Sequence, residues 1–395
     1  MLVRDHWHLN PDINFLNHGS FGACPKVVLE KQHALIRQLE QDPIRFLAPE
    51  RDLLPKLDEA RQSIGELTKA PSTDIVFVRN ATDGVNAVLS SYPFKKDDEI
   101  LITNHGYNAC KNAAHHAAEK TAAKVTVANV PFPLASKADV VQAIKEQVSS
   151  RTRVLLVDHV TSPTGLIFPM EEIIAFAHSQ DIQVLVDGAH APGMLPLDLT
   201  NLSPDYYTGN HHKWLCAPKA SGFLYVKPEL QTQVRPNVIS HGANQPHANR
   251  SRFLTEFDWT GTYDPTPLLS VPAALQFMNS LYPGGLTELY QRNKEKTLVA
   301  RKMLCDALEI DAPCNDEMIG SMASIPFKAE RFSRLIDTAA PADNLRRVLF
   351  NDHGFELPIF SMRDTNNACL RVSMQAYNEI SQIERLANVL IQLKG

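Results

Sequence analysis

The feature that most constrains the fold is a regular alternation of short apolar runs and helical stretches between residues 75 and 227. The runs are too uniformly apolar to have one face in water, so they fit strands buried on both faces. The stretches 84–91, 107–121, 138–149 and 170–180 have helical periodicity. The pattern therefore predicts an α/β fold, with a mostly parallel central sheet covered by helices on each side. The apolar runs are DIVFVRN, DEILITN, AKVTVANV, TRVLLVDHV, IQVLVDGAHA and GFLYVKP.

The sequence after Pro265 has a different texture. A long helical stretch is followed by a strand near SMASIPF, another helix, two short strands and a closing helix, which is an order typical of a smaller α+β domain. We therefore expect an N-terminal arm, residues 1–19, that joins the small domain, a large domain over 20–265 and a small C-terminal domain over 266–395. A chain of 395 residues is long enough for this division.

Composition narrows the function classes. The formal net charge is −5 and no run of lysines or arginines occurs, so no nucleic-acid or membrane partner is indicated. We find neither the apolar core of a signal peptide nor a segment apolar enough to span a bilayer, so a soluble, cytoplasmic protein is expected. The six cysteines are irregularly spaced without a C-x-x-C pair, which indicates reduced thiols. Small-molecule chemistry is the remaining default.

No metal site is expected. The neighbouring pairs His211 with His212 and His115 with His116 are the best candidates for ligands. Adjacent side chains in a strand point to opposite faces, and no third ligand has suitable spacing.

Polar residues follow a predicted strand where an anion would bind. In open parallel sheets, ligands gather at the carboxyl ends of the strands. Ala81 and Thr82 follow the run IVFVR and begin a helix, whose unpaired amides and dipole favour an anion such as a phosphate. The simpler alternative is that Thr82 or Asp83 is an ordinary N-cap.

A carboxylate and a lysine follow the later strands. Asp187 ends the run IQVLV, and a carboxylate buried there needs a hydrogen-bond partner or a cation such as a protonated pyridine nitrogen. Lys213 is expected at the mouth of the same sheet, where a lowered pKa would make its amine a nucleophile toward an aldehyde. Together with the anion cradle, these two residues describe a site for pyridoxal 5′-phosphate (PLP).

Several motifs carry a family resemblance. The runs VDGAHAPG, YYTGNHHKW and GFLYV resemble the fold-type I PLP-dependent enzymes, and specifically the class V aminotransferase family, which includes cysteine desulfurases and isopenicillin N epimerase. FLNHGSFGACP, DHVTSPTGLIFP, WTGTYDPTPLLSVPAAL and LRVSMQAYN resemble its isopenicillin N epimerase-like branch. The resemblance extends over most of the chain and implies the fold-type I architecture, with a large PLP-binding domain and a smaller α+β domain.

The resemblance implies roles for the residues around the PLP ring. Lys213 would form the Schiff base with PLP and later move the substrate α-proton. Asp187 would keep the ring nitrogen protonated, which makes the ring an electron sink. His190 would reach the ring hydroxyl, and Tyr107 would stack on the ring face.

The resemblance also implies a phosphate site and a subunit arrangement. The phosphate would bind the amides of Ala81 and Thr82 and the side chains of Thr82, Asn210 and His212. Thr262 would reach the phosphate from a second subunit, which implies a homodimer with shared active sites.

Substrate-binding residues follow from the same resemblance. Arg371 would bind the α-carboxylate of an amino-acid substrate, because a guanidinium matches a carboxylate with two parallel hydrogen bonds. Without the family context, Arg371 reads as an ordinary salt bridge at a strand end. Asn17 and His18 would lie near the substrate, although their motif, LNHGSFG, equally fits a plain turn. Arg45 is a further candidate for a distal carboxylate.

The cofactor does not fix the reaction. An epimerase-like or C–S lyase reaction that begins with α-proton abstraction by Lys213 is the leading hypothesis, and transamination follows it. A cysteine desulfurase is disfavoured, because Cys369 lies two residues before Arg371 in an expected strand rather than on a mobile loop. A non-catalytic PLP-binding module is the alternative from another class. The sequence does not identify the substrate, or any acid on the face of the ring opposite Lys213.

Overall fold

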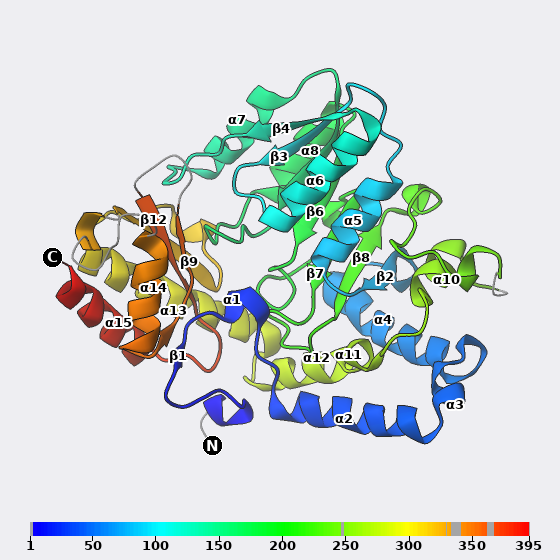
Figure 1. Cartoon of the computed structure of the whole chain (residues 1–395), viewed down its shortest axis with the longest axis horizontal. Coiled ribbons are helices and arrows are strands. Elements are labelled where there is room, and N and C mark those ends of the chain that lie inside the picture. The colour runs from blue at the N-terminus through cyan, green and yellow to red at the C-terminus, as the bar shows by residue number, and fades with distance from the viewer. Residues whose placement is uncertain (1–2, 246–248, 329, 333–340, 362–366, 395) are drawn as a thin grey trace.

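A seven-stranded sheet forms the centre of the computed structural model, which describes residues 3–245, 249–328, 330–332, 341–361 and 367–394 (Figure 1). Its strand order is β2-β8-β7-β6-β5-β3-β4. β8 runs antiparallel to both of its neighbours, β2 and β7, and all the other pairs in the sheet are parallel. The strands are β2 (Ile75–Val78), β3 (Glu99–Thr103), β4 (Lys124–Ala128), β5 (Thr152–Asp158), β6 (Gln183–Gly188), β7 (Tyr206–Asn210) and β8 (Gly222–Val226).

The predicted α/β class and the mostly parallel sheet are confirmed. The apolar runs gave six of the seven strands, but β7 was missed. Its sequence, YYTGN, ends in residues that favour turns, and only its position between β6 and β8 in the sheet makes it a strand.

Consecutive strand residues face two separate cores, as the period of two requires. In β5, Val154 and Leu156 belong to a cluster with side chains of α5, α6 and α10, whereas Leu155 and Val157 belong to a cluster with α7 and α8. The helices of this part are α2 (Lys26–Gln41), α3 (Pro43–Leu47), α4 (Leu54–Thr68), α5 (Ala81–Ser91), α6 (Asn108–Thr121), α7 (Lys137–Gln147), α8 (Met170–Ser179), α9 (Leu199–Leu202) and α10 (Arg252–Asp258).

The C-terminal part builds a second, antiparallel sheet of order β11-β12-β9. The arm before α2 reaches the C-terminal part, because β1 (Asn14–Phe15) pairs in parallel with β10 (Phe355–Glu356) in a separate two-stranded sheet. The domain boundary at 265 and 266 stays a prediction. The remaining elements are α1 (His18–Phe21), α11 (Thr266–Leu269), α12 (Val271–Ser280), α13 (Gly285–Leu308), β9 (Met322–Lys328), α14 (Pro341–Asn351), β11 (Ile359–Ser361), β12 (Asn367–Ser373) and α15 (Ile380–Leu393).

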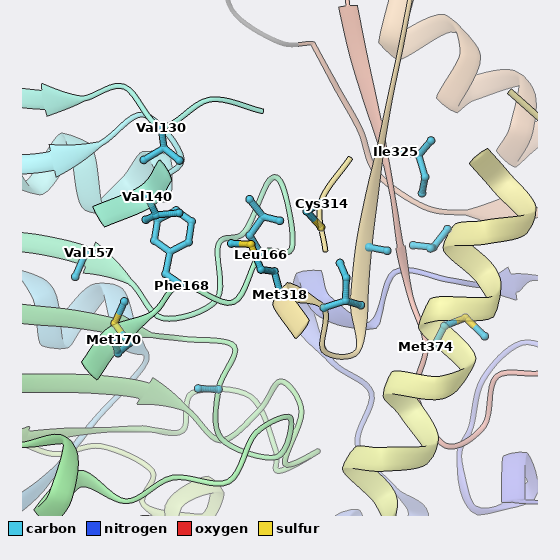
Figure 2. Close-up of a cluster of buried hydrophobic side chains, with 14 of the residues drawn as sticks. Val130, Val140, Val157, Leu166, Phe168, Met170, Cys314, Met318, Ile325 and Met374 are labelled. Carbon is cyan, nitrogen blue, oxygen red and sulfur yellow. The ribbon is translucent and has the colours of Figure 1, made fainter. Parts of the chain in front are cut away.

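One apolar core joins the two sheets. Figure 2 shows Phe168 and Leu166 on one side and Met318 and Ile325 on the other, all within one cluster of buried side chains. The Ile167 amide donates to the Met318 carbonyl at 2.9 Å, which ties the two halves at this point. None of the helices in the described residues is both long and apolar enough to cross a membrane.

Candidate active site

The carboxyl ends of the central strands gather polar side chains on one face. Asp158, Asp187 and Thr208 lie in register across β5, β6 and β7. Each comes two residues after a strand residue that faces α5 and α6 (Leu156, Leu185 and Tyr206), so the alternation places all three side chains on that face. Gly84 of α5 packs closely here, since a Cβ on it would lie 2.3 Å from Thr208 Oγ1. The helix that follows β2 is thereby held directly against the sheet.

Lys213 lies buried beyond the end of β7. Its Nζ is 3.1 Å from Nε2 of His190. Burial lowers the pKa of Lys213 to about 8; the charge of Asp187 raises this pKa and that of Arg371 lowers it, both to a smaller degree. A larger fraction of the amine is therefore neutral at physiological pH than for a lysine in water.

Trp214 sets the tautomer of His190. Its indole N–H, which can only donate, lies 3.2 Å from His190 Nδ1. Burial, followed by the charge of Lys213, lowers the pKa of His190 well below its usual value, so the ring is neutral. A neutral ring that accepts at Nδ1 carries its proton on Nε2, which then donates to Lys213 Nζ. Sequence reasoning did not assign Trp214 a role.

Asp187 is buried with hydrogen bonds but without a cation. Its Oδ1 accepts from the Ala189 amide at 3.0 Å, and its Oδ2 accepts from the Cys110 thiol at 3.1 Å. It forms no ion pair with any described residue. A buried carboxylate in this state suits a cationic ligand group such as a protonated ring nitrogen.

Tyr107 lies at the start of α6, near Lys213. It is the N-cap of α6, its side chain is 44% exposed, and Lys213 Nζ lies 5.9 Å from the centre of its ring. A half-exposed aromatic ring beside the lysine leaves a surface on which a flat ligand can stack.

The start of α5, where the sequence predicts a phosphate site, differs in detail from that prediction. The N-cap of α5 is Asn80, rather than Thr82 or Asp83, and its side chain accepts from the Asp83 amide. The Ala81 amide, expected to be free, donates to Asn210 Oδ1 at 2.8 Å. Asn210 thus lies at the start of α5 as expected, but it already occupies one of the two amides assigned to the anion.

His212 lies beside this helix start with one nitrogen in use. Its Nδ1 is 3.0 Å from the carbonyl oxygen of Ser221, which can only accept, so Nδ1 donates. Burial lowers the pKa of His212 to about 4, which leaves Nε2 without a proton at neutral pH. An anion would hydrogen-bond to Nε2 only with a proton taken up there.

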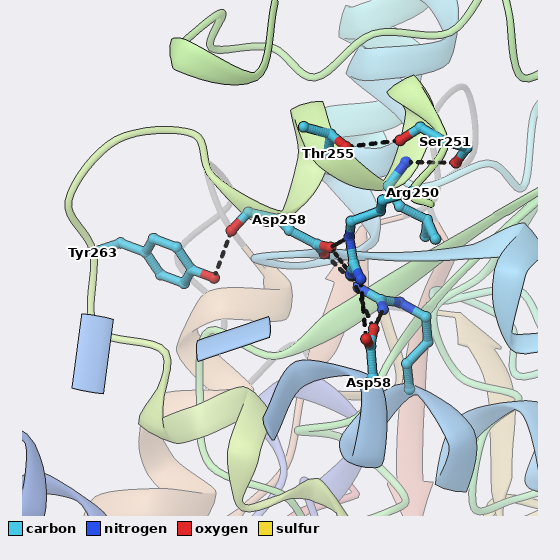
Figure 3. A network of polar contacts seen from close by, with 8 residues as sticks. Asp58, Arg250, Ser251, Thr255, Asp258 and Tyr263 are labelled. Carbon is cyan, nitrogen blue, oxygen red and sulfur yellow. Dashed lines mark hydrogen bonds and ion pairs between the residues drawn. The ribbon is translucent and has the colours of Figure 1, made fainter. Parts of the chain in front are cut away.

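Thr262 is exposed, on the segment between α10 and α11. Asp258 at the end of α10 is buried in a network with Arg250, Asp58 and Arg61 (Figure 3). Arg250 donates to both oxygens of Asp58 at 2.9 and 3.0 Å, and the Tyr263 hydroxyl donates to the Asp258 carbonyl at 3.3 Å. The network fixes the base of the segment and leaves Thr262 facing solvent.

Arg371 of β12 is a buried guanidinium without an acidic partner among the described residues. Its side chain is 1% exposed. Nη1 donates to the Ser162 carbonyl, Nη2 donates to Ser20 Oγ at 3.1 Å, and Nε has no hydrogen-bond partner in the described part of the chain. Among the described residues, Arg371 thus forms no strand-end salt bridge, and its charge is left for an anion.

The N-terminal arm lies between Lys213 and Arg371. Asn17 Oδ1 accepts from Arg371 Nη2 at 3.4 Å, so Asn17 lies beside the guanidinium, and its contact with a substrate stays a prediction. His18 differs from the expectation of a substrate contact, because its Nδ1 bonds the Tyr377 hydroxyl at 2.7 Å and its Nε2 bonds the Lys213 carbonyl at 3.0 Å. It holds the lysine backbone instead.

Arg45 is not brought to this site by any contact in the described chain. It lies on α3 with its side chain 67% exposed and forms an ion pair with Asp52 at 3.4 Å. Figure 1 shows α3 at the end of α2 away from α1.

The cysteines are free thiols, and Cys216, on the loop that carries Lys213, is buried, which raises its pKa. Cys369 is buried in β12 opposite Phe360, and burial raises its pKa to about 12. A protonated thiol fixed in a strand is a poor nucleophile.

Comparison with known sequences gives a consistent match along the chain. The model of a family described as Aminotransferase class-V matches residues 22–386. The chain is 30% identical to isopenicillin N epimerase from Streptomyces clavuligerus, over 100% of this chain and 98% of that protein. It is 28% identical to a probable chloroplastic L-cysteine desulfhydrase from Arabidopsis thaliana, over 97% of this chain and 83% of that protein.

Comparison with solved structures shows the same fold. A mutant of the enzyme C-DES, with glycine covalently linked to its PLP cofactor, has a TM-score of 0.83 at 20% identity and covers 100% of both chains. C-DES, described as a cystine C–S lyase, in complex with cysteine persulfide has a TM-score of 0.80 at 21% identity, over 98% of this chain and 99% of that one.

Proposed function

Because the chain belongs to the aminotransferase class V family of PLP-dependent enzymes, which act on amino acids, we propose that it binds PLP beside Lys213 and cleaves the C–S bond of a cysteine-like amino acid. Buried Arg371, which has no acidic partner in the described part of the chain, is the observation that carries the substrate class. A guanidinium in this state, close enough to Lys213 to lower its pKa, suits the α-carboxylate of an amino acid.

The residues present fit PLP. Asp187, buried without a cation among the described residues, supplies the charge that a protonated ring nitrogen needs. Tyr107 offers a ring for stacking, and the start of α5 with Thr82 offers donors for a phosphate, to which His212 adds one when a proton is taken up on Nε2. When bound, the cofactor supplies an electron-withdrawing ring that stabilises the negative charge left on the substrate α-carbon.

Lys213 serves as the amine that holds the cofactor and then as the base for the α-proton. Its lowered pKa supports both tasks, because each needs a neutral amine. The donating Nε2 of His190 holds Nζ in place before the cofactor arrives. His18 fixes the carbonyl of the same residue, so the side chain starts from an anchored backbone.

Arg371 orients the substrate for this proton transfer. Two parallel hydrogen bonds to the α-carboxylate fix the rotation of the α-carbon relative to Lys213. Nη2 is now bonded to Ser20 and Asn17, so a bound carboxylate takes over that position from the arm. The arm then lies directly over the substrate and excludes water from the proton-transfer step.

C–S cleavage makes the smallest demand on this set of residues. One base and a leaving group on the β-carbon suffice, whereas epimerisation also needs a proton donor on the opposite face of the ring. With L-cysteine and water as reactants, the products would be pyruvate, ammonia and hydrogen sulfide. The relatives named as L-cysteine desulfhydrases support this choice.

Epimerisation is the second candidate, because the chain matches an isopenicillin N epimerase at 30% identity over its whole length. Transamination and a non-catalytic PLP-binding module are weaker alternatives. A desulfurase is disfavoured by the buried, strand-bound Cys369.

We also propose a homodimer. Phe21 and Ile44, on α1 and α3 near the two ends of α2, are 74% and 68% exposed, and a second copy that packs along α2 would cover both. In such a dimer, exposed Thr262 would contact the phosphate of the partner's cofactor, and Arg45 would become available to the partner's substrate.

Proton NMR in deuterated water, with purified protein, PLP and a panel of L-amino acids that includes cysteine and cystine, tests the proposed reaction. We expect loss of the α-proton signal and formation of pyruvate from cysteine or cystine. A D-amino acid instead of pyruvate would establish epimerisation, and a keto acid that retains the side chain would establish transamination. No exchange with any member of the panel would contradict the proposed function.

A further inference from the structure

Asp158 is a buried carboxylate that the proposed mechanism does not use. It ends β5 in register with Asp187, and it is 4% exposed. Its side chain follows Leu156 to the face covered by α6. Two adjacent buried carboxylates need an explanation, because burial penalises the charged form and like charges repel each other.

The two carboxylates hold the same turn of α6. Asp158 lies against the start of α6, where a Cβ on Gly106 would be 3.6 Å from its Oδ1, and it accepts from the backbone amide of Tyr107, the N-cap of the helix. Asp187 accepts from the thiol of Cys110, one turn further on. The first turn of α6, with the Tyr107 ring at its start, is therefore fastened to β5 and to β6 at separate points.

The charges around Asp158 come from three sides. Asp187 faces it from β6, Lys111 from α6 and Lys213 from the segment after β7. Burial first and the charge of Asp187 second raise the pKa of Asp158 well above its usual range, while the Tyr107 amide and the two lysines lower it less. Asp158 forms no ion pair within the described ranges. A protonated carboxyl group keeps a carbonyl oxygen that accepts the Tyr107 amide.

We propose that Asp158 is a positioning residue whose carboxyl oxygen holds the first turn of α6, and with it the Tyr107 ring, against the end of the sheet beside Asp187. The proposal rests on the proposed function, in which Tyr107 stacks on the PLP ring.

The test compares Asp158→Asn with Asp158→Ala, using two readouts on the full chain. Asparagine is a neutral group of the same shape that still accepts the Tyr107 amide, whereas alanine removes the acceptor. In the protein without PLP, we expect Asp158→Ala to speed backbone hydrogen exchange in the peptide 104–112 by ~10-fold, the effect of one lost hydrogen bond. The Kd for PLP should rise by a similar factor of ~10. Asp158→Asn should change both quantities by less than about threefold.

Asp205→Asn is the matched control. Asp205 is also buried, and it also accepts a hydrogen bond from a backbone amide, that of Val184 at 2.8 Å. It lies, however, just before β7, at the end of the strand opposite to Asn210. This variant should leave exchange in the peptide 104–112 unchanged.

Two results would overturn the proposal. If Asp158→Asn loosens the peptide as much as alanine does, or fails to fold, Asp158 acts through a charge. If Asp158→Ala leaves exchange unchanged, Asp158 holds nothing. The exchange readout needs no cofactor, so wild-type protein that does not bind PLP would refute the proposed function while the exchange data still decide the role of Asp158.

Discussion

Nε2 of His190 lies 3.1 Å from Nζ of Lys213, and the proton between them belongs to the histidine. Trp214 occupies Nδ1 with its indole N–H, so the neutral imidazole must donate from Nε2. A donor facing Nζ favours the neutral amine over the ammonium ion, and burial acts in the same direction. His190 and Trp214, together with the burial of Lys213, thus favour the neutral form of Nζ, which is the form that reacts with an aldehyde.

The first prediction concerns pH. Covalent attachment of PLP needs neutral Lys213, and the neutral fraction rises as the pH rises toward the pKa of about 8. We therefore expect the attachment rate, followed by stopped-flow absorption in PLP-free protein from pH 6 to 10, to rise about tenfold per pH unit at first and to level off above about pH 8. A rate that keeps rising tenfold per unit through pH 10 would show that the amine is not perturbed. Lys213→Ala should show no attachment at any pH, and Lys219→Ala, which removes a second lysine with a lowered pKa, should behave like wild type.

The second prediction concerns Trp214. Replacing it with phenylalanine frees His190 to carry its proton on Nδ1, so Nε2 then accepts from the ammonium form of Lys213. We expect the inflection near pH 8 to move upward and the free energy of unfolding to fall by roughly 1–2 kcal/mol. Trp7→Phe is the control, because Trp7 is equally buried and its indole N–H also has one partner, the Ala23 carbonyl. An inflection that shifts equally in both variants would argue against the tautomer mechanism.

The third prediction concerns Arg371. Lysine cannot form two parallel hydrogen bonds to a carboxylate, so Arg371→Lys should raise KM for the amino acid by ~100-fold. The Kd for PLP should stay within about twofold, since the guanidinium does not contact the proposed cofactor site. Arg301→Lys controls for burial, because Arg301 is buried on α13 and bonds Asp316 and the Cys314 carbonyl. A change in Kd for PLP as large as that in KM would indicate that Arg371 stabilises the fold rather than the substrate.

The fourth prediction concerns the shared site. If Thr262 serves the partner's cofactor, Lys213→Ala and Thr262→Glu disable different halves of each site. Equal mixing of the two inactive proteins, after dissociation and reassociation, should restore about one quarter of wild-type α-proton exchange, because half of the dimers then contain one intact site. Restoration should fail if Thr262 serves its own subunit, and light scattering that shows a monomer would remove the basis of the prediction.

Most of the fold could be predicted from the sequence, because buried parallel strands have a strong local signal. β4, with its exposed first residue, and β5, with its buried run, were both recognisable. β7 was not, since Thr208, Gly209 and Asn210 become strand residues only through pairing with β6 and β8. Residues whose strand conformation depends on pairing within the sheet, rather than on their own β-propensity, cannot be recognised as a strand from one sequence.

The candidate site was predictable where one residue type implies one chemistry. Lys213, Asp187 and Arg371 come close enough for the two charges to shift the lysine pKa, although their roles stay predictions. Asp158 carried the same signal as Asp187, an acidic residue at the end of an apolar strand, and it was overlooked. The role of Trp214 depends on which way its indole points, and no spacing rule gives that.

The joint core in Figure 2 has a consequence for how a substrate enters. Leu166 and Met318 sit in one continuous apolar cluster, so swinging the two halves apart would expose that cluster to water at a cost of about 25 cal/mol for each Å². The side chains of Asn17 and Ser20, by contrast, contact Arg371 through hydrogen bonds that water can replace. We therefore expect a substrate to reach the Arg371 guanidinium by displacing these two side chains, without a movement of the two halves of the molecule.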